Sequence, residues 1–205
     1  EHTILAQTGS DALGDDYGTV TVTNEDGDEA SLFTHDDYAT VEFVPGYGYT
    51  FAGWEDEDGN LLSTDNPYTF MVEDDVTLTA TVNPIPYDVF VDIYNDGDGS
   101  YPRGDVSIVS PVNYLDEAEP QYIENVYGYV FDFWADDNGE EVTDFTVYEP
   151  TTYWAHFKKD LFNVNGALDA QYAMMGHIET NTEAEYLEEV TLTAVDNPGY
   201  TFTGW

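Results

Sequence analysis

The stretch "ATVEFVPGYGYTFAGW" (39–54) is the most informative about the fold, because it joins an alternating strand to an aromatic phrase that recurs twice. Its second half, "YGYTFAGW" (47–54), recurs as "YGYVFDFW" (127–134) and as "NPGYTFTGW" (197–205). Recurrence at a spacing of about 70–80 residues is typical of tandem repeats rather than of one large domain. We therefore expect three copies of one module, the third ending at its tryptophan.

The segments around each phrase alternate between apolar and polar residues, which is the pattern of half-buried β-strands. In "DVTLTATV" (75–82), Val76, Leu78, Ala80 and Val82 share one face, and threonines occupy the other. Asp-Gly and Asn-Gly pairs between such segments indicate hairpin turns. The predicted fold class is all-β, with small antiparallel-sheet modules in tandem. Helix is scarce, and only "NTEAEYLEE" (181–189) is expected to form a short turn or a loop.

The aromatic residues of the phrase have two interpretations. Exposed Tyr and Trp rings could stack on sugars, whereas buried rings would fill the core of the module. Their fixed place in a strand of every copy favours the core. We expect Phe51, Trp54, Leu78 and Val82 to be buried together.

Composition shifts mark the module boundaries. The short, stiff segment "NPIPYD" (83–88) and the basic "KKDLF" (158–162) separate the copies. The expected organisation is an N-terminal extension, two complete repeats and an incomplete third repeat, with the boundaries 1–16, 17–84, 85–160 and 161–205.

The charge of the chain excludes several classes of partner. Lys and Arg number 3 against 43 Asp and Glu, giving a formal net charge of −40. Nucleic acids and anionic membrane surfaces would be repelled, and no apolar run is long enough to insert into a bilayer. Cysteine is absent, which excludes disulfides and thiolate metal sites. Such a solvated acidic surface suits a salty or cation-rich exterior, so we expect an extracellular or cell-surface location.

The repeated pattern resembles a known family. Two parts of the chain are similar to InlB-type B-repeats, also called Listeria–Bacteroides repeats. One is "VTLTAVDNPGYTFTGW" (190–205). The other follows Trp54 and consists of the acidic Gly turn, "NPYTFMV" (66–72) and "VTLTATV" (76–82). The similarity covers roughly residues 17–205. It implies small β-rich, grasp-like modules of bacterial surface or secreted proteins, used as stalk, spacer or adhesive structure. It supplies no catalytic residues.

Acidic turns are the candidate metal sites. Ca²⁺ prefers six to eight oxygen ligands, which Asp, Asn and backbone carbonyls supply. None of the turns matches the twelve-residue calcium loop, and hairpin formation explains them equally well. The candidate ligands are Asp26, Asp28, Asp56, Asp58, Asp96, Asp98, Asp136 and Asp137. No cofactor is required, and calcium or other cations remain candidates.

Two further features suggest interaction rather than chemistry. Arg103, Gly104 and Asp105 spell the integrin-recognition tripeptide in a predicted loop, although so short a motif also arises by chance. The strand-like "HTILAQT" (2–8) matches no repeat, and through Ile4 and Leu5 it could complete the unfinished third module of another subunit. The alternative is that the protein simply continues beyond Trp205.

The function predicted is structural and non-enzymatic: an extracellular stalk, adhesin shaft or fibre subunit that self-associates or contacts neighbouring repeats of a longer chain. The four histidines are scattered, and phosphate-binding glycine motifs are absent. Acidic pairs are so common that they carry no information about catalysis. The alternative is a glycan- or receptor-binding module of a secreted bacterial protein, with a host or glycan ligand.

Overall fold

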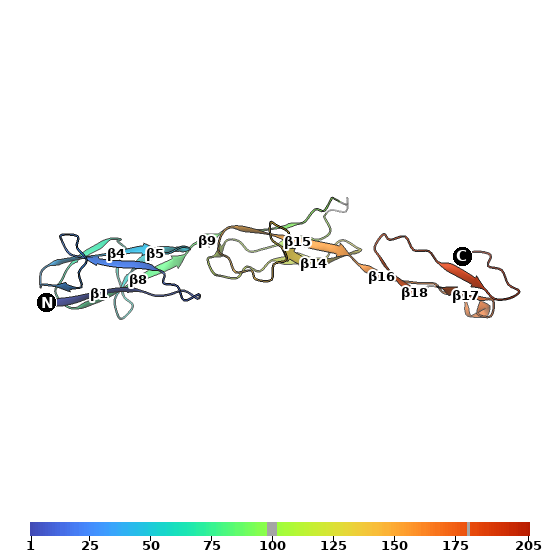
Figure 1. The fold of residues 1–205 in the computed structure, drawn as a ribbon, viewed down its shortest axis with the longest axis horizontal. Coiled ribbons are helices and arrows are strands. Elements are labelled where there is room, and N and C mark those ends of the chain that lie inside the picture. The colour runs from blue at the N-terminus through green and yellow to red at the C-terminus, as the bar shows by residue number, and fades with distance from the viewer. Residues whose placement is uncertain (98–101, 180) are drawn as a thin grey trace. The chain divides into compact units, whose positions relative to one another are not determined.

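The computed structural model describes residues 1–97, 102–179 and 181–205. Contacts within the chain divide it into two compact units. The first comprises Glu1–Val89, Val109–Ala118 and Asp144–Thr151, and the second comprises Phe90–Ile108, Glu119–Thr143 and Thr152–Trp205. In the described part of the chain, strands dominate (Figure 1), and the single helical segment is a 3₁₀ turn at Ala170–Tyr172. The all-β prediction is confirmed. No helix in these ranges is long and apolar enough to cross a membrane.

The first unit is built from two sheets and a small strand pair. A five-stranded sheet has the order β3-β1-β8-β5-β6, a three-stranded sheet has the order β2-β4-β7, and β9 pairs with β12. The strands are β1 (His2–Thr8), β2 (Gly18–Thr23), β3 (Leu32–Phe33), β4 (Tyr38–Pro45), β5 (Tyr49–Glu55), β6 (Leu61–Ser63), β7 (Tyr68–Met71), β8 (Val76–Pro84), β9 (Pro86–Tyr87) and β12 (Val112–Asn113).

The alternation read from the sequence places the core between these two sheets. Leu78 of β8 is 0% exposed, and Val41 of β4 and Trp54 of β5 are equally buried in the same cluster. Phe51 and Val82 are half-buried at the margin of this cluster rather than inside it. The predicted core is therefore correct at its centre. The threonines of β8 point to the opposite face of the sheet, as the period of two requires.

Strand β1 corrects the expectation that residues 1–16 lie outside any repeat. It pairs in parallel with β8, from Ile4 opposite Val76 to Thr8 opposite Ala80, and antiparallel with β3. Ile4 is 2% exposed in the core, whereas Leu5 points outward. A role as donor strand for another subunit would remove Ile4 from its own core, at a cost of about 2–5 kcal/mol if it resembles a large-to-small core substitution.

The second unit contains one three-stranded sheet, β10-β15-β14, and three strand pairs, β11-β13, β16-β18 and β17-β19. Residues 181–185, expected as turn or loop, form strand β18 instead. The strands are β10 (Val89–Ile93), β11 (Asp105–Ser107), β13 (Gln121–Ile123), β14 (Tyr129–Ala135), β15 (Thr151–Lys159), β16 (Leu161–Asn165), β17 (Gly176–Glu179), β18 (Asn181–Glu185) and β19 (Thr193–Asp196). Val89 and Thr151, the first residues of β10 and β15, belong to the first unit.

The β14–β15 pair repeats the β5–β8 pair in detail. Both pairs are antiparallel, and both have a β-bulge at the same place in the aromatic phrase, between Phe51 and Gly53 and between Phe131 and Phe133. Trp134 is 7% exposed, like its counterpart Trp54. Core packing of these two tryptophans is therefore observed. Trp205, by contrast, is 70% exposed.

Candidate functional site: the repeat junctions

The repeats share an opening that the sequence analysis missed. Each has a non-glycine residue with positive φ shortly after a short strand: Asp36 (φ 73°), Leu115 (φ 65°) and Leu187 (φ 63°). The residue before it carries a ring that contacts an aromatic residue of the opening strand. These ring pairs are His35 with His2 at 5.6 Å, Tyr114 with Tyr87 at 6.4 Å, and Tyr186 with Phe162 at 6.1 Å.

In the first unit, the ring of Tyr114 covers Gly48 of the aromatic phrase. Gly48 has φ 83°, and a Cβ atom added there would overlap the Tyr114 ring. Tyr47 and Tyr49 flank the glycine and meet the Tyr114 ring edge-on, with centroid distances of 5.6 and 5.3 Å. Glycine is thus required at position 48 for two reasons: its positive φ angle, and the close approach of the Tyr114 ring. We call this arrangement the first junction.

Backbone hydrogen bonds also stabilise the first junction. The Ile85 amide donates to the Gly48 carbonyl at 2.8 Å, and the Tyr114 amide donates to the Ile85 carbonyl at 2.9 Å. Ile85 lies between β8 and β9, so it links the closing strand of the first repeat to the opening strand of the next. The Tyr47 hydroxyl also donates to the Tyr148 carbonyl at 3.2 Å.

The second unit builds the same arrangement from different residues, which we call the second junction. The Tyr186 ring covers Gly128, which has φ 90°, and a Cβ on that glycine would overlap the ring. The Asp160 amide donates to the Gly128 carbonyl, and the Tyr186 amide donates to the Asp160 carbonyl, both at 2.9 Å. Tyr127 and Tyr129 approach the Tyr186 ring edge-on at 5.6 and 5.7 Å. Two junctions with the same bonds indicate one recurrent device.

Two phenols of the first junction, those of Tyr49 and Tyr114, are kept neutral. Burial, and then the nearby Asp11 carboxylate, raise the pKa of Tyr49 to about 12. The same two causes, in the same order, raise the pKa of Tyr114. Since a phenolate would be desolvated and repelled, the junction favours uncharged contacts.

A third glycine occupies the corresponding position in the last copy of the phrase. Gly199 precedes Trp205 by the spacing that separates Gly48 from Trp54 and Gly128 from Trp134. It too has positive φ, 89°, but no atom lies within 4 Å of where its Cβ would be.

In each of three acidic turns, an Asp or Asn side chain at the start of the turn accepts backbone amides and so stabilises the hairpin. The Asp56 carboxylate accepts the amides of Asp58 and Asn60, at 2.9 and 2.8 Å, and the hydrogen bonds of Asn60 are the main reason why its pKa is lowered. Asn24 and Asp136 cap their turns in the same way. Each turn also has a glycine with positive φ, namely Gly27, Gly59 and Gly139.

This turn geometry separates the predicted metal ligands. The backbone amides of Asp26, Asp28 and Asp58 donate to the capping side chains, and the Asp28 carbonyl also accepts the Asn24 amide. The Asp96 carboxylate accepts from Arg103, and the Asp137 carboxylate accepts from Trp154. Asp98 lies outside the described residues. Within those residues, no group of three or more His, Asp or Glu side chains is arranged to hold a metal ion.

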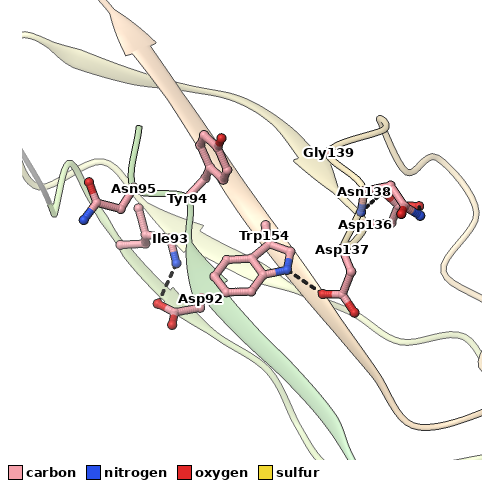
Figure 2. Close-up of a pocket in the computed structure, with 9 residues that line it drawn as sticks. All are labelled: Asp92, Ile93, Tyr94, Asn95, Asp136, Asp137, Asn138, Gly139 and Trp154. Carbon is pink, nitrogen blue, oxygen red and sulfur yellow. Dashed lines mark hydrogen bonds between the residues drawn. The ribbon is translucent and has the colours of Figure 1, made fainter. Parts of the chain in front are cut away.

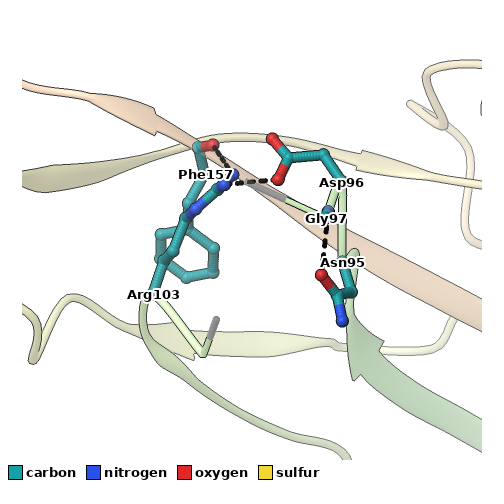
Figure 3. Close-up of polar contacts among 5 residues, drawn as sticks. All are labelled: Asn95, Asp96, Gly97, Arg103 and Phe157. Atoms are coloured by element: carbon teal, nitrogen blue, oxygen red, sulfur yellow. Dashed lines mark hydrogen bonds and ion pairs between the residues drawn. The ribbon is translucent and has the colours of Figure 1, made fainter. Parts of the chain in front are cut away.

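The integrin-like tripeptide is not displayed as the sequence suggested. Arg103 is 6% exposed, and its guanidinium donates to the Phe157 carbonyl and to the Asp96 carboxylate (Figure 3). It also lies 5.2 Å from the centre of the Tyr129 ring. Gly104 is packed against the Phe157 ring, and only Asp105 is exposed. The interaction predicted for this tripeptide is wrong for Arg103, because its charge is already neutralised inside the second unit.

Comparison with known families agrees with the repeated architecture. The model of the divergent InlB B-repeat domain matches residues 13–86 and 167–205, together more than half of the chain. No curated protein and no solved structure is significantly similar to this chain. Both matched segments contain a copy of the aromatic phrase with its positive-φ glycine. The chain therefore belongs to the divergent InlB B-repeat domain family.

Proposed function

We propose that the chain is a non-enzymatic structural segment of a bacterial surface protein, a stalk, adhesin shaft or fibre subunit whose repeats are coupled by aromatic–glycine junctions. The observation that carries this proposal is the recurrence of the junction. Gly48 with Tyr114, and Gly128 with Tyr186, make the same ring contact and the same two backbone hydrogen bonds.

The chain path at each junction supports mechanical coupling. β8 ends at Pro84 and β9 begins at Pro86, while β15 ends at Lys159 and β16 begins at Leu161. A connection this short has almost no conformational freedom, in contrast to a flexible linker. The covering ring and the backbone bonds then hold the next opening strand. A spacer needs this resistance to bending, whereas a catalytic domain gains nothing from it.

Location and partners follow from the family and the charge. B-repeats are modules of bacterial surface proteins, and a net charge of −40 keeps such a segment solvated outside the cell. Neighbouring repeats are the partners that the junction fits. Gly199 has the backbone angle to receive the corresponding tyrosine of a further repeat. The alternative of glycan binding through the aromatic phrase loses support, because Trp54 and Trp134 are buried.

Distance distributions across the first junction test the proposal. The chain contains no cysteine, so spin labels on Asp58→Cys and Glu117→Cys, both exposed and both in the first unit, report one distance. We expect a narrow distribution that Gly48→Ala broadens. Gly27→Ala is the matched control, since Gly27 has φ 83° but nothing near its Cβ position. A distribution that is broad without mutation, or equally affected by both substitutions, would contradict mechanical coupling.

A further inference from the structure

The second repeat differs from the first on the outer face of its sheet. The register aligns β15 with β8, so that Trp154 and His156 stand where the first repeat has Thr79 and Thr81. On the neighbouring strand, Phe133 pairs with His156 as Gly53 pairs with Thr81. Small or hydroxylated side chains of the first repeat are thus replaced by rings. Core packing does not explain this change, because the inward-facing positions keep their own apolar residues.

The rings form an ordered wall. His156 is stacked between Tyr94, at 4.3 Å and 16°, and Phe133, at 4.5 Å and 8°. Burial lowers the pKa of His156, so the imidazole is uncharged at neutral pH. The wall is therefore apolar and held in place by stacking. Tyr94 remains 44% exposed.

A hollow of about 520 Å³ is lined by Tyr94, the exposed ring of this stack, and by Trp154 (Figure 2). Trp154 lies between Asp92, Tyr94 and Asn95 on one side and the Asp136–Gly139 turn on the other. The indole N–H donates to Asp137 at 2.8 Å, which fixes the ring. The lining includes three carboxylates, Asp92, Asp136 and Asp137, and no basic side chain.

A hollow beside the equivalent acidic turn of the first repeat provides an internal comparison. It is lined by Asp56, Glu57, Asp58 and Asp75 together with short or aliphatic side chains, and it contains no aromatic ring. Acidic residues are thus common to both repeats, and the ring is particular to the second. An aromatic face next to carboxylates attracts a cation by cation–π and ionic contacts together.

We propose that the Trp154 hollow binds the ammonium or guanidinium group of a lysine or arginine side chain on a basic partner protein. The ligand would lay its charged head against the Trp154 face and donate to the carboxylates of Asp92 and Asp137. A cation is attracted by the negative charge of the Asp136–Gly139 turn, whereas a neutral ligand of the same shape is not. With only 3 basic residues, the chain is poorly suited to supply this group itself.

Titration of the full chain with small amides tests the site. The probes are Nα-acetyl-lysine methylamide and Nα-acetyl-arginine methylamide, with the norleucine amide as the uncharged isostere, at physiological salt. The readout is the indole N–H resonance of Trp154 in a ¹H–¹⁵N spectrum, with exposed Trp205 as the internal control. We expect a saturable shift at Trp154 with both cationic amides and none with the norleucine amide.

Two variants distinguish binding at the Trp154 hollow from a general attraction of cations to an acidic protein. Trp154→Thr restores the residue of the first repeat and keeps every carboxylate; it should weaken binding by about threefold to thirtyfold, monitored at backbone amides of the Asp136–Gly139 turn. Asp137→Asn keeps an acceptor for the indole and removes one charge, so it should also weaken binding. Equal affinity in Trp154→Thr, parallel unsaturable shifts at Trp205, or a response to norleucine amide would overturn the proposal. A shift at Trp154 with N-acetylglucosamine but not with the cationic amides would do so as well.

Discussion

Replacing Gly48 by alanine is the most direct perturbation of a junction. An L-residue in the left-handed region costs about 1–2 kcal/mol, and this applies equally to Gly27→Ala, since both glycines have φ 83°. Only at position 48 would the new Cβ also overlap the Tyr114 ring. Displacing that ring forfeits its contacts with Tyr47, Tyr49 and Tyr87, each worth about 0.5–1.5 kcal/mol. The excess cost of Gly48→Ala should therefore be about 2–4 kcal/mol.

Amide hydrogen exchange measures this excess at the junction itself. A global melting curve is less suitable, because a chain with two compact units need not unfold in one step. The amides of Ile85 and Tyr114 form the junction hydrogen bonds, so they should exchange about 30- to 1,000-fold faster in Gly48→Ala than in Gly27→Ala. Exchange at these amides that agrees within about threefold between the two variants would refute the role of the ring.

Further expectations concern the core, the buried arginine and the stacked histidine. Trp54→Ala should cost about 3–5 kcal/mol in chemical denaturation, because its side chain is fully buried, whereas exposed Trp205→Ala should change little. Arg103→Met should cost about 1.5–3 kcal/mol, since it removes the guanidinium that donates to the Phe157 carbonyl and the Asp96 carboxylate, while Asp105→Glu should alter neither stability nor integrin-dependent cell adhesion. The pKa of His156 is lowered below 6.5 by burial, so the unfolded chain binds more protons in that window and stability should fall as pH decreases through it. Comparing His156→Phe with the unmodified chain between pH 7 and pH 5 isolates this contribution, because the carboxylates are common to both; identical slopes would contradict it.

The sequence predicted those features that depend on local pattern. Alternation located β4, β5 and β8, and Asp-Gly or Asn-Gly pairs located the hairpin turns, because both signals lie within a few residues. The burial of Trp54 and Trp134 followed from their fixed place in a strand. These are properties of the repeat, and the repeat is visible in the sequence.

The features that escaped prediction depend on partners far away in the chain. β1 pairs in parallel with β8, and a parallel pair has no connecting turn that would announce it. Arg103 looked exposed because a three-residue motif carries no information about Asp96 and Phe157. Tyr114 and Tyr186 were overlooked because the residue after each is a leucine with positive φ, a conformation that sequence gives no reason to expect.

The acidity of the chain explains why its repeats would be coupled by rings and backbone bonds. With 3 basic residues against 43 acidic ones, few ion pairs are available to join successive modules. Neutral phenols, such as Tyr49 with its pKa raised to about 12, avoid the repulsion that charged contacts would meet.

Salt should therefore have opposite effects on the junctions and on the Trp154 hollow. At about 1 M salt, screening reduces the Debye length to about 3 Å, so the repeats should become more stable and the junction amides remain protected. Binding at the Trp154 hollow should weaken under the same conditions, because its attraction for a cation is largely electrostatic. Junction amides that lose protection in high salt would show that the coupling is ionic after all.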